Sequence, residues 1–402
     1  VIFFTNNQRA NSQTEGIRGV WLTNVDSDVL TSKQKIIEAV NFLNELNFNT
    51  IFVVVWNKGM TQYKSKIMKE FTGVEIDTLL KGFDPLPVLI DEAHKRNMKV
   101  IYDPEKPLDC DTTSTIGIFD GVHLGHRKII DLINAEAQLK GLKSLVVTFH
   151  PHPQTIIRGN RLPLIVPIEE RFRLLEDSGV DLVVCFKFTR EFSILSARDF
   201  TVEVLVGKLR IKSIFIGKDF FFGRNREGNI ELLRTFGEKF GFRVNMVEPV
   251  LIGGEVVSST AIRNLLSDGD VRKVASFLGR YFAISGIVDE GEKRGRMLGF
   301  PTANIRTSWE MLPKIGVYAT RAYFDGKRYD SITNVGRRPT FGKNDVGVET
   351  HIFDFAGNIY GKTIRVEFIE RLRDEKRFES MEALSAEIKR DVLRARGILA
   401  YT

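Results

Sequence analysis

Cysteine is scarce in this sequence, and long apolar runs and blocks of basic residues are missing. Only Cys110 and Cys185 occur, which argues against a disulfide scaffold or a cysteine-ligated zinc and fits a reducing compartment. No apolar run approaches the roughly 20 residues of a membrane helix. The 58 basic and 51 acidic residues are spread along the chain, so an anionic small substrate explains the net positive charge as well as a nucleic acid does. No basic cluster marks a nucleic-acid surface, so we expect no nucleic-acid partner. The scarce cysteines and the missing apolar runs lead us to expect a cytoplasmic protein without a membrane partner.

The chain of 402 residues is long enough for two or three domains, and its apolar pattern predicts three segments. Residues 1–108 read as a β-α-β-α-β run. One helix is opened by Thr31, with Gln34 completing a capping box, and another covers about 84–96. Such a run is too short to close a barrel or to cover both faces of a sheet.

The second segment, residues 109–272, alternates apolar strands with helices. Its predicted helices cover about 168–177, 197–209 and 229–240, and its five predicted strands are STIGIF (114–119), SLVVTF, DLVVCF, SIFIG and FRVNMV. This alternation predicts an α/β fold with a doubly wound parallel sheet, whose ligands bind beyond the carboxyl ends of the strands.

The third segment, residues 273–402, alternates apolar and polar residues with period two and ends in an amphipathic helix from about residue 380. Its predicted strands lie in YFAISGIVDEG, GVYATRAYFDG, YDSITNVG, VETHIFDF and TIRVEFIE. Glycine-containing turns separate them, which predicts a small antiparallel β-barrel followed by a helix.

Two histidines follow the first strand of the second segment, in GIFDGVHLGHRKII (117–130). Asp120-Gly121 reads as a tight turn, and the apolar residues beyond it have helical spacing. His123 and His126 then fall on the first turn of a helix, where free backbone N–H groups attract anions and Gly125 would let a phosphate approach. The alternative interpretation is a pair of core histidines.

A second hydroxyl-rich helix start lies far downstream, in VSSTAIRNLL. Ser258, Ser259 and Thr260 offer hydroxyl donors there, and Arg263 follows one turn into the helix. The alternative is a simple N-cap, which contributes about 1 kcal/mol and occurs on many helices.

These two motifs, together with TFHPHP and GKDFFFGRNREG, resemble the nucleotidylyltransferase superfamily and, within it, the bacterial bifunctional riboflavin kinase/FMN adenylyltransferases, also called FAD synthetases. The resemblance runs from about 114 to about 400. It implies that the FMN phosphate attacks the α-phosphorus of ATP, giving FAD and pyrophosphate. It also implies that His123 and His126 contact the α- and β-phosphates, and that Arg263, Ser259 and Thr260 contact the leaving pyrophosphate.

Further nucleotide and flavin contacts follow from the same resemblance. Phe119 and Asp120, with the turn residue Gly121, would border the nucleotide, and His152 matches the patterned histidine of TFxPHP beside the active-site cleft. The place of GKDFFFG after the fourth predicted strand favours a flavin or nucleotide wall, whereas the plain alternative is aromatic core. The residues of this wall would be Asp219, Phe220 and Phe222.

GEKRGRMLGFPTANI (291–305) resembles the riboflavin kinase loop and PTAN motif. The resemblance implies that Thr302 and Asn304 hold the magnesium of Mg-ATP, with a loop around the phosphates formed by Gly291, Lys293, Gly295, Arg296, Gly299 and Pro301. GNIYGKT (357–363) is no P-loop, because its glycine spacing is one residue short and a predicted strand follows it.

ITNVGRRPTF and VETHIF match the rest of the kinase module, and they contain the candidate site residues Asn334 and Glu349. Glu349 aligns with the proposed general base of the family for the ribityl 5′-hydroxyl. Its alternative is a solvent-facing strand residue, because period two sends Glu349, His351, Phe353 and Phe355 to one face.

The first segment does not fit this family. GIRGVWLTNVDSDVL and NTIFVVVWNKGM resemble the opening β/α units of a glycoside-hydrolase-like TIM-barrel family. The resemblance ends near Pro104, and one strand-end carboxylate, Asp103, makes no glycosidase pair. We expect a catalytically silent barrel fragment.

The sequence thus predicts an enzyme that makes FMN from riboflavin and FAD from FMN, with Mg²⁺ and ATP required for both steps. Its partners would be the small molecules riboflavin, FMN and ATP, and an oligomer is left open. One alternative is a nucleotidylyltransferase for another phosphate substrate with a degenerate kinase half. Another is a carbohydrate-related protein built on the N-terminal fragment.

Overall fold

The protein is described by a computed structural model that covers residues 19–22, 29–45, 50–53, 56–57, 60–61, 80, 83–95, 99–101, 108, 110–159, 162–289, 299–337 and 346–402. Contacts divide the chain into two compact units. The first contains Val1–Ile118, Ile129–Leu162 and Phe172–Glu248, and the second contains Phe119–Lys128, Pro163–Arg171 and Pro249–Thr402. The boundaries expected from the sequence, after residues 108 and 272, come from changes in the apolar pattern and not from contacts. They stay a prediction.

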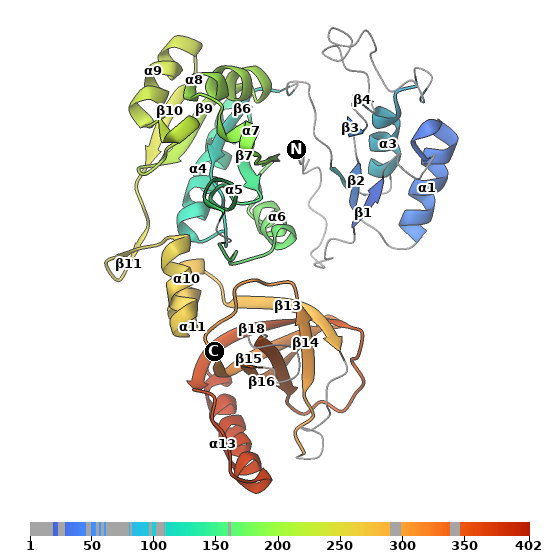
Figure 1. The fold of residues 1–402 in the computed structure, drawn as a ribbon, viewed down its shortest axis with the longest axis vertical. Helices are drawn as coiled ribbons and strands as arrows, with labels where there is room; N and C mark the ends of the chain where they lie inside the picture. Colours follow the sequence, from blue (N-terminus) through green and yellow to red (C-terminus); the bar gives the residue numbers. More distant parts are fainter. Residues whose placement is uncertain are drawn as a thin grey trace. The chain divides into compact units, whose positions relative to one another are not determined.

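The N-terminal part contains a three-stranded parallel sheet in the order β1 (Gly19–Leu22), β2 (Thr50–Val53), β5 (Lys99–Ile101). Helices α1 (Lys33–Glu45) and α3 (Pro85–His94) pack against each other beside it (Figure 1). A 3-10 turn, η1 (Val29–Thr31), and a short hairpin of β3 (Trp56–Asn57) and β4 (Met60–Thr61) complete it. The β-α-β-α-β prediction is confirmed, and the small core contains Ile36, Val40, Leu43, Ile51 and Leu89.

The predicted start of α1 was wrong. Thr31 ends the 3-10 turn, and the helix begins at Lys33. Ser32 caps it instead, because the backbone N–H of Lys35 donates to its Oγ at 3.3 Å. At α3, Asp84 accepts from the N–H of Leu86 at 3.3 Å and Pro85 occupies the first helical position, where a missing N–H costs nothing.

The second sheet has five parallel strands in the order β10 (Arg243–Val247), β9 (Ile211–Gly217), β6 (Thr112–Ile116), β7 (Lys143–His150), β8 (Leu182–Lys187). The chain starts in the middle at β6 and runs outwards in both directions, so the predicted doubly wound sheet is confirmed. Strand order reverses beside β6, which is where ligands bind in such sheets. Strand β6 ends at Ile116, three residues earlier than expected, because the following residues already form the turn.

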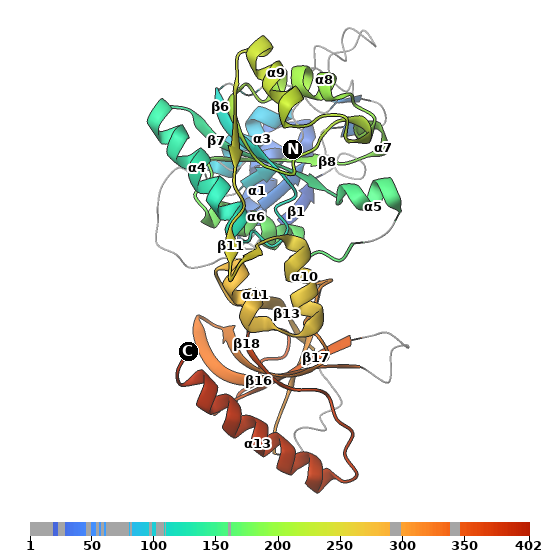
Figure 2. The same cartoon turned by 90° about the vertical axis from the view of Figure 1, so that its left-hand side faces the viewer.

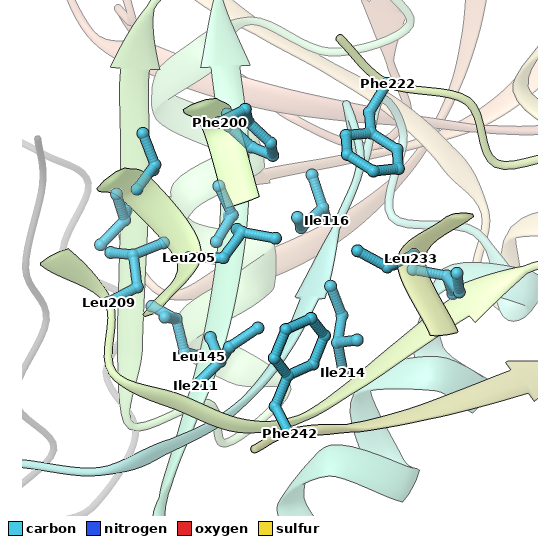
Figure 3. Close-up of a cluster of buried hydrophobic side chains, with 14 of the residues drawn as sticks. Ile116, Leu145, Phe200, Leu205, Leu209, Ile211, Ile214, Phe222, Leu233 and Phe242 are labelled. Atoms are coloured by element: carbon cyan, nitrogen blue, oxygen red, sulfur yellow. The ribbon is translucent and has the colours of Figure 1, made fainter. Parts of the chain in front are cut away.

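Helical segments connect these strands. They are α4 (Leu124–Lys140), α5 (Pro153–Arg158), α6 (Ile168–Asp177), α7 (Arg190–Ser193), α8 (Ala197–Asp199), the π-helix η3 (Phe200–Lys208), the 3-10 turn η4 (Arg224–Arg226) and α9 (Ile230–Phe240). The single helix predicted over 197–209 is thus a short α-helix continued by a π-helix. Figure 3 shows apolar side chains of the sheet meeting those of η3 and α9. This core includes Ile116, Leu145, Ile214, Phe200, Leu205, Leu233 and Phe242.

The C-terminal part begins with a hairpin of β11 (Leu251–Ile252) and β12 (Glu255–Val256), then α10 (Ser259–Asp268) and α11 (Val271–Leu278). A closed antiparallel barrel follows in the order β13-β14-β17-β16-β15-β18. Its strands are β13 (Phe282–Asp289), β14 (Ala303–Thr307), β15 (Gly316–Phe324), β16 (Lys327–Arg337), β17 (Val346–Ile352) and β18 (Thr363–Arg373). Helix α13 (Met381–Leu399) lies against β15, β16 and β18 (Figure 2).

The predicted barrel with its C-terminal helix is confirmed, but the sequence prediction missed one strand. Residues of the PTAN motif were expected only in a loop, whereas Ala303–Thr307 form β14 and pair with both β13 and β17. Ala303 and Ile305 are buried and alternate with half-exposed Asn304, a pattern too short to identify from sequence. None of the helices in the described part of the chain combines the length and apolar content that a membrane crossing requires.

Candidate functional site

The turn after β6 has an unusual backbone. Phe119, Gly121 and Val122 all have positive φ angles, of 54°, 80° and 40°. The N–H of Val122 donates to the Phe119 carbonyl at 3.1 Å, which closes the predicted turn at Asp120-Gly121. A side chain at Gly121 would lie 3.2 Å from Ile165. Two non-glycine residues in this region store strain, a feature that clusters at functional sites.

His123 and His126 lie at the start of α4, as predicted. His123 immediately precedes the helix and caps it, because the N–H of His126 donates to its Nδ1 at 3.3 Å. The two imidazole rings are stacked, with centroids 3.6 Å apart. A Cβ on Gly125 would lie 3.2 Å from the His123 ring, so any other residue there would push on that ring.

Burial and positive charge keep both imidazoles neutral at neutral pH. Burial, with the charges of Arg280 and Arg263, lowers the pKa of His123 from 6.5 to about 4. Burial also holds the pKa of His126 well below its ordinary value, and His123, Arg171 and Arg280 add to the effect. The Nδ1 atom of His126 is buried and makes no hydrogen bond within the described part of the chain. Buried polar atoms without a hydrogen-bond partner are uncommon in folded proteins.

Arg280 and Arg171 were not predicted from sequence. Arg280 donates to the carbonyls of Gly121 at 2.6 Å and Val122 at 3.1 Å, so it holds the turn directly. Arg171, in the first turn of α6, has a side chain that is almost wholly buried. Neither lies in a motif near the histidines in sequence, and only the fold brings them to the site.

Asp120 and Arg263 form a buried ion pair of 2.5 Å. Asp120 is 1% exposed, and its carboxylate also accepts from the N–H groups of Ile165 at 3.0 Å and Val166 at 3.3 Å. Arg263 donates through Nε to the Pro163 carbonyl at 2.9 Å. The predicted residues Asp120 and Arg263 are therefore brought together, and both fasten the segment around residue 165 to the histidine turn.

The helix start of α10 reaches the same turn. Ser259 donates to the Asp120 carbonyl at 2.8 Å. Ser258 is the N-cap and accepts from the N–H of Ala261 at 3.2 Å, so the simple cap interpretation holds for Ser258. Thr260 is exposed. Phe119 is buried, with its ring 4.8 Å from that of His126.

The remaining adenylyltransferase candidates belong to the first compact unit. His152 caps α5 by accepting from the N–H of Gln154 at 3.1 Å. Phe222 lies in the apolar core, with Phe220 packed against that core, and Asp219 is exposed. The exposed ring of this segment is Phe221, which lies beneath the guanidinium of Arg226 at 4.4 Å.

The kinase candidates of the barrel share one row across three strands. Asn304 on β14 pairs with Glu349 on β17, and Glu349 pairs with Asn334 on β16. All three are half-buried, whereas their sequence neighbours are buried inside the barrel. Side chains directly opposite one another in an antiparallel sheet are about 5 Å apart at Cβ. The outer surface of the barrel therefore gathers a carboxylate and two amides.

Strand β17 also holds the PTAN segment. The Nδ1 atom of His351 lies 2.8 Å from the Pro301 carbonyl, and its ring is edge-on to Phe300. Thr302 follows directly and is half-buried. Strand β17 ends at Ile352, but the ring of Phe353 still lies beside that of His351, with centroids 5.8 Å apart. Gly299 is described and has a φ of +81°, whereas Gly291, Lys293, Gly295, Arg296, Asp103 and Pro104 lie outside the described residues.

We expect the protein to lose stability as the pH falls from 6.5 towards about 4. In this range an imidazole takes up a proton in the unfolded chain but not in the folded one, so acid favours unfolding. His123→Asn offers Oδ1 as acceptor for the same His126 N–H without titrating, and should make the dependence shallower. Denaturant unfolding of the unchanged protein and of His123→Asn across this pH range measures the free energy of unfolding. An equal pH dependence of that free energy in the two proteins would contradict the buried neutral state of His123.

Family models match three successive segments of the chain. The family model described as FAD synthetase matches residues 105–261, and that of riboflavin kinase matches residues 278–399. Residues 16–103 match a family described as glycosyl hydrolase-like 10, which confirms the resemblance of the N-terminal segment.

Individual relatives cover both C-terminal segments. The bifunctional riboflavin kinase/FMN adenylyltransferase of Escherichia coli K12 is 38% identical over 290 residues, which are 72% of this chain and 93% of that protein. The Bacillus subtilis protein of the same name is 35% identical over 283 residues, 69% of this chain and 89% of that protein. A crystal structure titled as a macrolide-efflux protein from Streptococcus pneumoniae is 30% identical, with a TM-score of 0.68, and covers 73% of this chain and 96% of that chain. The chain therefore belongs to the bifunctional riboflavin kinase/FMN adenylyltransferase family.

Proposed function

We propose that this chain phosphorylates riboflavin to FMN in its barrel and adenylylates FMN to FAD in its α/β segment, with ATP as the substrate of both steps. One observation carries the proposal: a chain of this family has both a stacked histidine pair at a helix start and a carboxylate-amide row on the barrel. The corresponding domains would be residues 109–272 and 273–402. Residues 1–108 would have no catalytic role, and the enzyme would act in the cytoplasm without nucleic-acid or membrane partners.

In the adenylyl transfer, an FMN phosphate oxygen attacks the α-phosphorus of ATP and the bond to pyrophosphate breaks. No covalent enzyme intermediate is needed, so the protein aligns two anions and stabilises negative charge. His123 accepts the His126 N–H at Nδ1, so its own proton is on Nε2, where it can be donated to a phosphate. The start of α4 adds backbone donors and its dipole, and Gly125 leaves them accessible.

The other candidate residues of this half would have separate roles in the reaction. Arg263, Ser259 and Thr260, with Ser258 at the cap, would face the leaving pyrophosphate, while Arg263 also keeps its pair with Asp120. Phe119, Asp120 and Gly121 would border the nucleotide. The flavin or nucleotide wall would come from Asp219, Phe220 and Phe222, and His152 would match the patterned histidine of TFxPHP.

In the kinase step, Glu349 would accept the proton of the ribityl 5′-hydroxyl while that oxygen attacks the γ-phosphorus of ATP and ADP leaves. Asn304 and Asn334, its direct cross-strand neighbours, would orient the reacting groups. Thr302 and Asn304 offer hard oxygen donors in small number, which fits a magnesium ion whose other ligands are phosphate and water. Gly291, Lys293, Gly295, Arg296, Gly299 and Pro301 would enclose the phosphates.

The direct test is chromatographic analysis of the products after the purified chain has been incubated with riboflavin, ATP and magnesium. We expect FMN to form first and FAD to follow. Omitting magnesium should stop product formation, because the ion neutralises the phosphate charges. Pyrophosphate release with another phosphate acceptor, and none with FMN, would favour a nucleotidylyltransferase of different specificity.

Replacing His126 should separate the two activities. We expect His126→Ala to lower the rate of FAD formation from supplied FMN by about 10²- to 10³-fold, the typical loss on removing one preorganised donor. FMN formation from riboflavin should be unchanged and serves as the internal control. A comparable loss of both activities would contradict the assignment of His126 to adenylyl transfer.

Replacing Glu349 should have the reciprocal effect. Glu349→Gln keeps the size and hydrogen-bonding ability of the side chain but removes the base, so FMN formation should fall by about 10²- to 10⁴-fold. Adenylylation of supplied FMN should stay at the rate of the unchanged chain. If Glu349→Gln instead retains full kinase activity, Glu349 is not the base.

A further inference from the structure

Residues 163–171, here called the strap, run beside the histidine turn. The Pro163 carbonyl accepts from Arg263 at 2.9 Å, and the N–H groups of Ile165 and Val166 donate to the buried carboxylate of Asp120. The first half of the strap is thus fixed to the turn by backbone hydrogen bonds to two charged side chains. Such bonds are about twice as strong as neutral ones.

The same strap is bonded to the barrel. The N–H of Leu164 donates to Oε2 of Glu310, between β14 and β15, at 3.0 Å. Glu170 forms an ion pair of 3.1 Å with Arg365 on β18. The side chains of Glu170 and Arg365 are only 13% and 28% exposed, so this pair is better shielded from water than an ordinary surface pair.

The strap ends in the first turn of α6, where neighbouring residues face the barrel and the histidine pair. Glu170 contacts the barrel, and the next residue, Arg171, is almost wholly buried and close enough to His126 for its charge to lower the pKa of that imidazole. Consecutive residues of a helix are rigidly related, about 100° apart around the axis. A displacement of Glu170 therefore displaces Arg171 relative to the histidine pair.

We propose that Arg365 and Glu310 of the barrel are positioning residues for adenylyl transfer, acting through the strap on Arg171 and the histidine turn. Neither residue needs to touch a substrate. The inference rests on the proposed function, because it assigns kinase-barrel residues to the other reaction. Small displacements near reacting atoms have large effects: a misplacement of about 1 Å can cost about 10²-fold in rate.

The experiment compares the full-length chain with Arg365→Gln, Glu170→Gln and the double variant, measuring both reactions separately. We expect each single variant to lower kcat of FAD formation from supplied FMN by about threefold to tenfold. The KM for ATP in that reaction, and the rate of FMN formation from riboflavin, should each change by less than about twofold. The double variant should be no slower than the slower single variant, because the Glu170–Arg365 pair is lost in all three, while the second pair of Arg365, with Glu367 at 3.6 Å, lies within β18. Glu310→Ala, which removes the acceptor of the Leu164 N–H, should give the same selective loss.

Lys362→Gln is the matched control, because Lys362 also pairs with a carboxylate of the barrel, Asp325, without contacting the strap. Its rate of FAD formation should equal that of the unchanged chain. Unaltered FAD formation in Arg365→Gln, an equal loss of both reactions, or multiplying losses in the double variant would each overturn the proposal. The unchanged chain is assayed alongside, so its own failure to make FAD would count against the proposed function instead.

Discussion

The buried ion pair of Asp120 and Arg263 is the interaction on which the arrangement of the site depends. It joins the histidine turn, the strap and helix α10, three segments that are far apart in sequence. Asp120 is almost wholly buried, so its charge is tolerable only because Arg263 and two backbone N–H groups surround it. Removing either partner would leave an uncompensated buried charge, which is strongly destabilising. The pair therefore connects the strained turn to two other segments of the chain.

The electrostatics of the histidine pair follow from that arrangement. Burial is the main cause of the lowered pKa of both imidazoles, and the charges of Arg263, Arg280 and Arg171 lower the pKa of one or both further. The site thus combines fixed positive charge from arginines with neutral imidazole donors. This combination suits a polyphosphate, because the arginines attract it while the imidazoles supply directed hydrogen bonds.

The barrel carries its candidate kinase residues on neighbouring strands and not at a helix start. Its described strands bury a chain of hydrogen-bonded hydroxyls from Thr320, Thr333 and Thr350. The polar row of Asn304, Glu349 and Asn334 lies on the opposite face of the described strands from Thr333 and Thr350. His351 then ties the PTAN segment to the same strand that carries Glu349. In the described part of the barrel, the candidate kinase residues are therefore organised by strand register.

The sequence by itself determined the parallel sheet, the barrel with its helix, and the helix start that carries His123 and His126. Each of these depends on local periodicity, glycine placement and capping, which are visible within a few residues of one another. The sequence could not show that His123 caps α4, that Asp120 and Arg263 pair, or that Arg171 and Arg280 lie beside the histidines. Strand β14 was missed because its alternation is too short to stand out and its pairing partners are distant. Only the tertiary structure decided these points, because the energy of a buried charge or a strand pair depends on groups that folding brings from elsewhere in the chain.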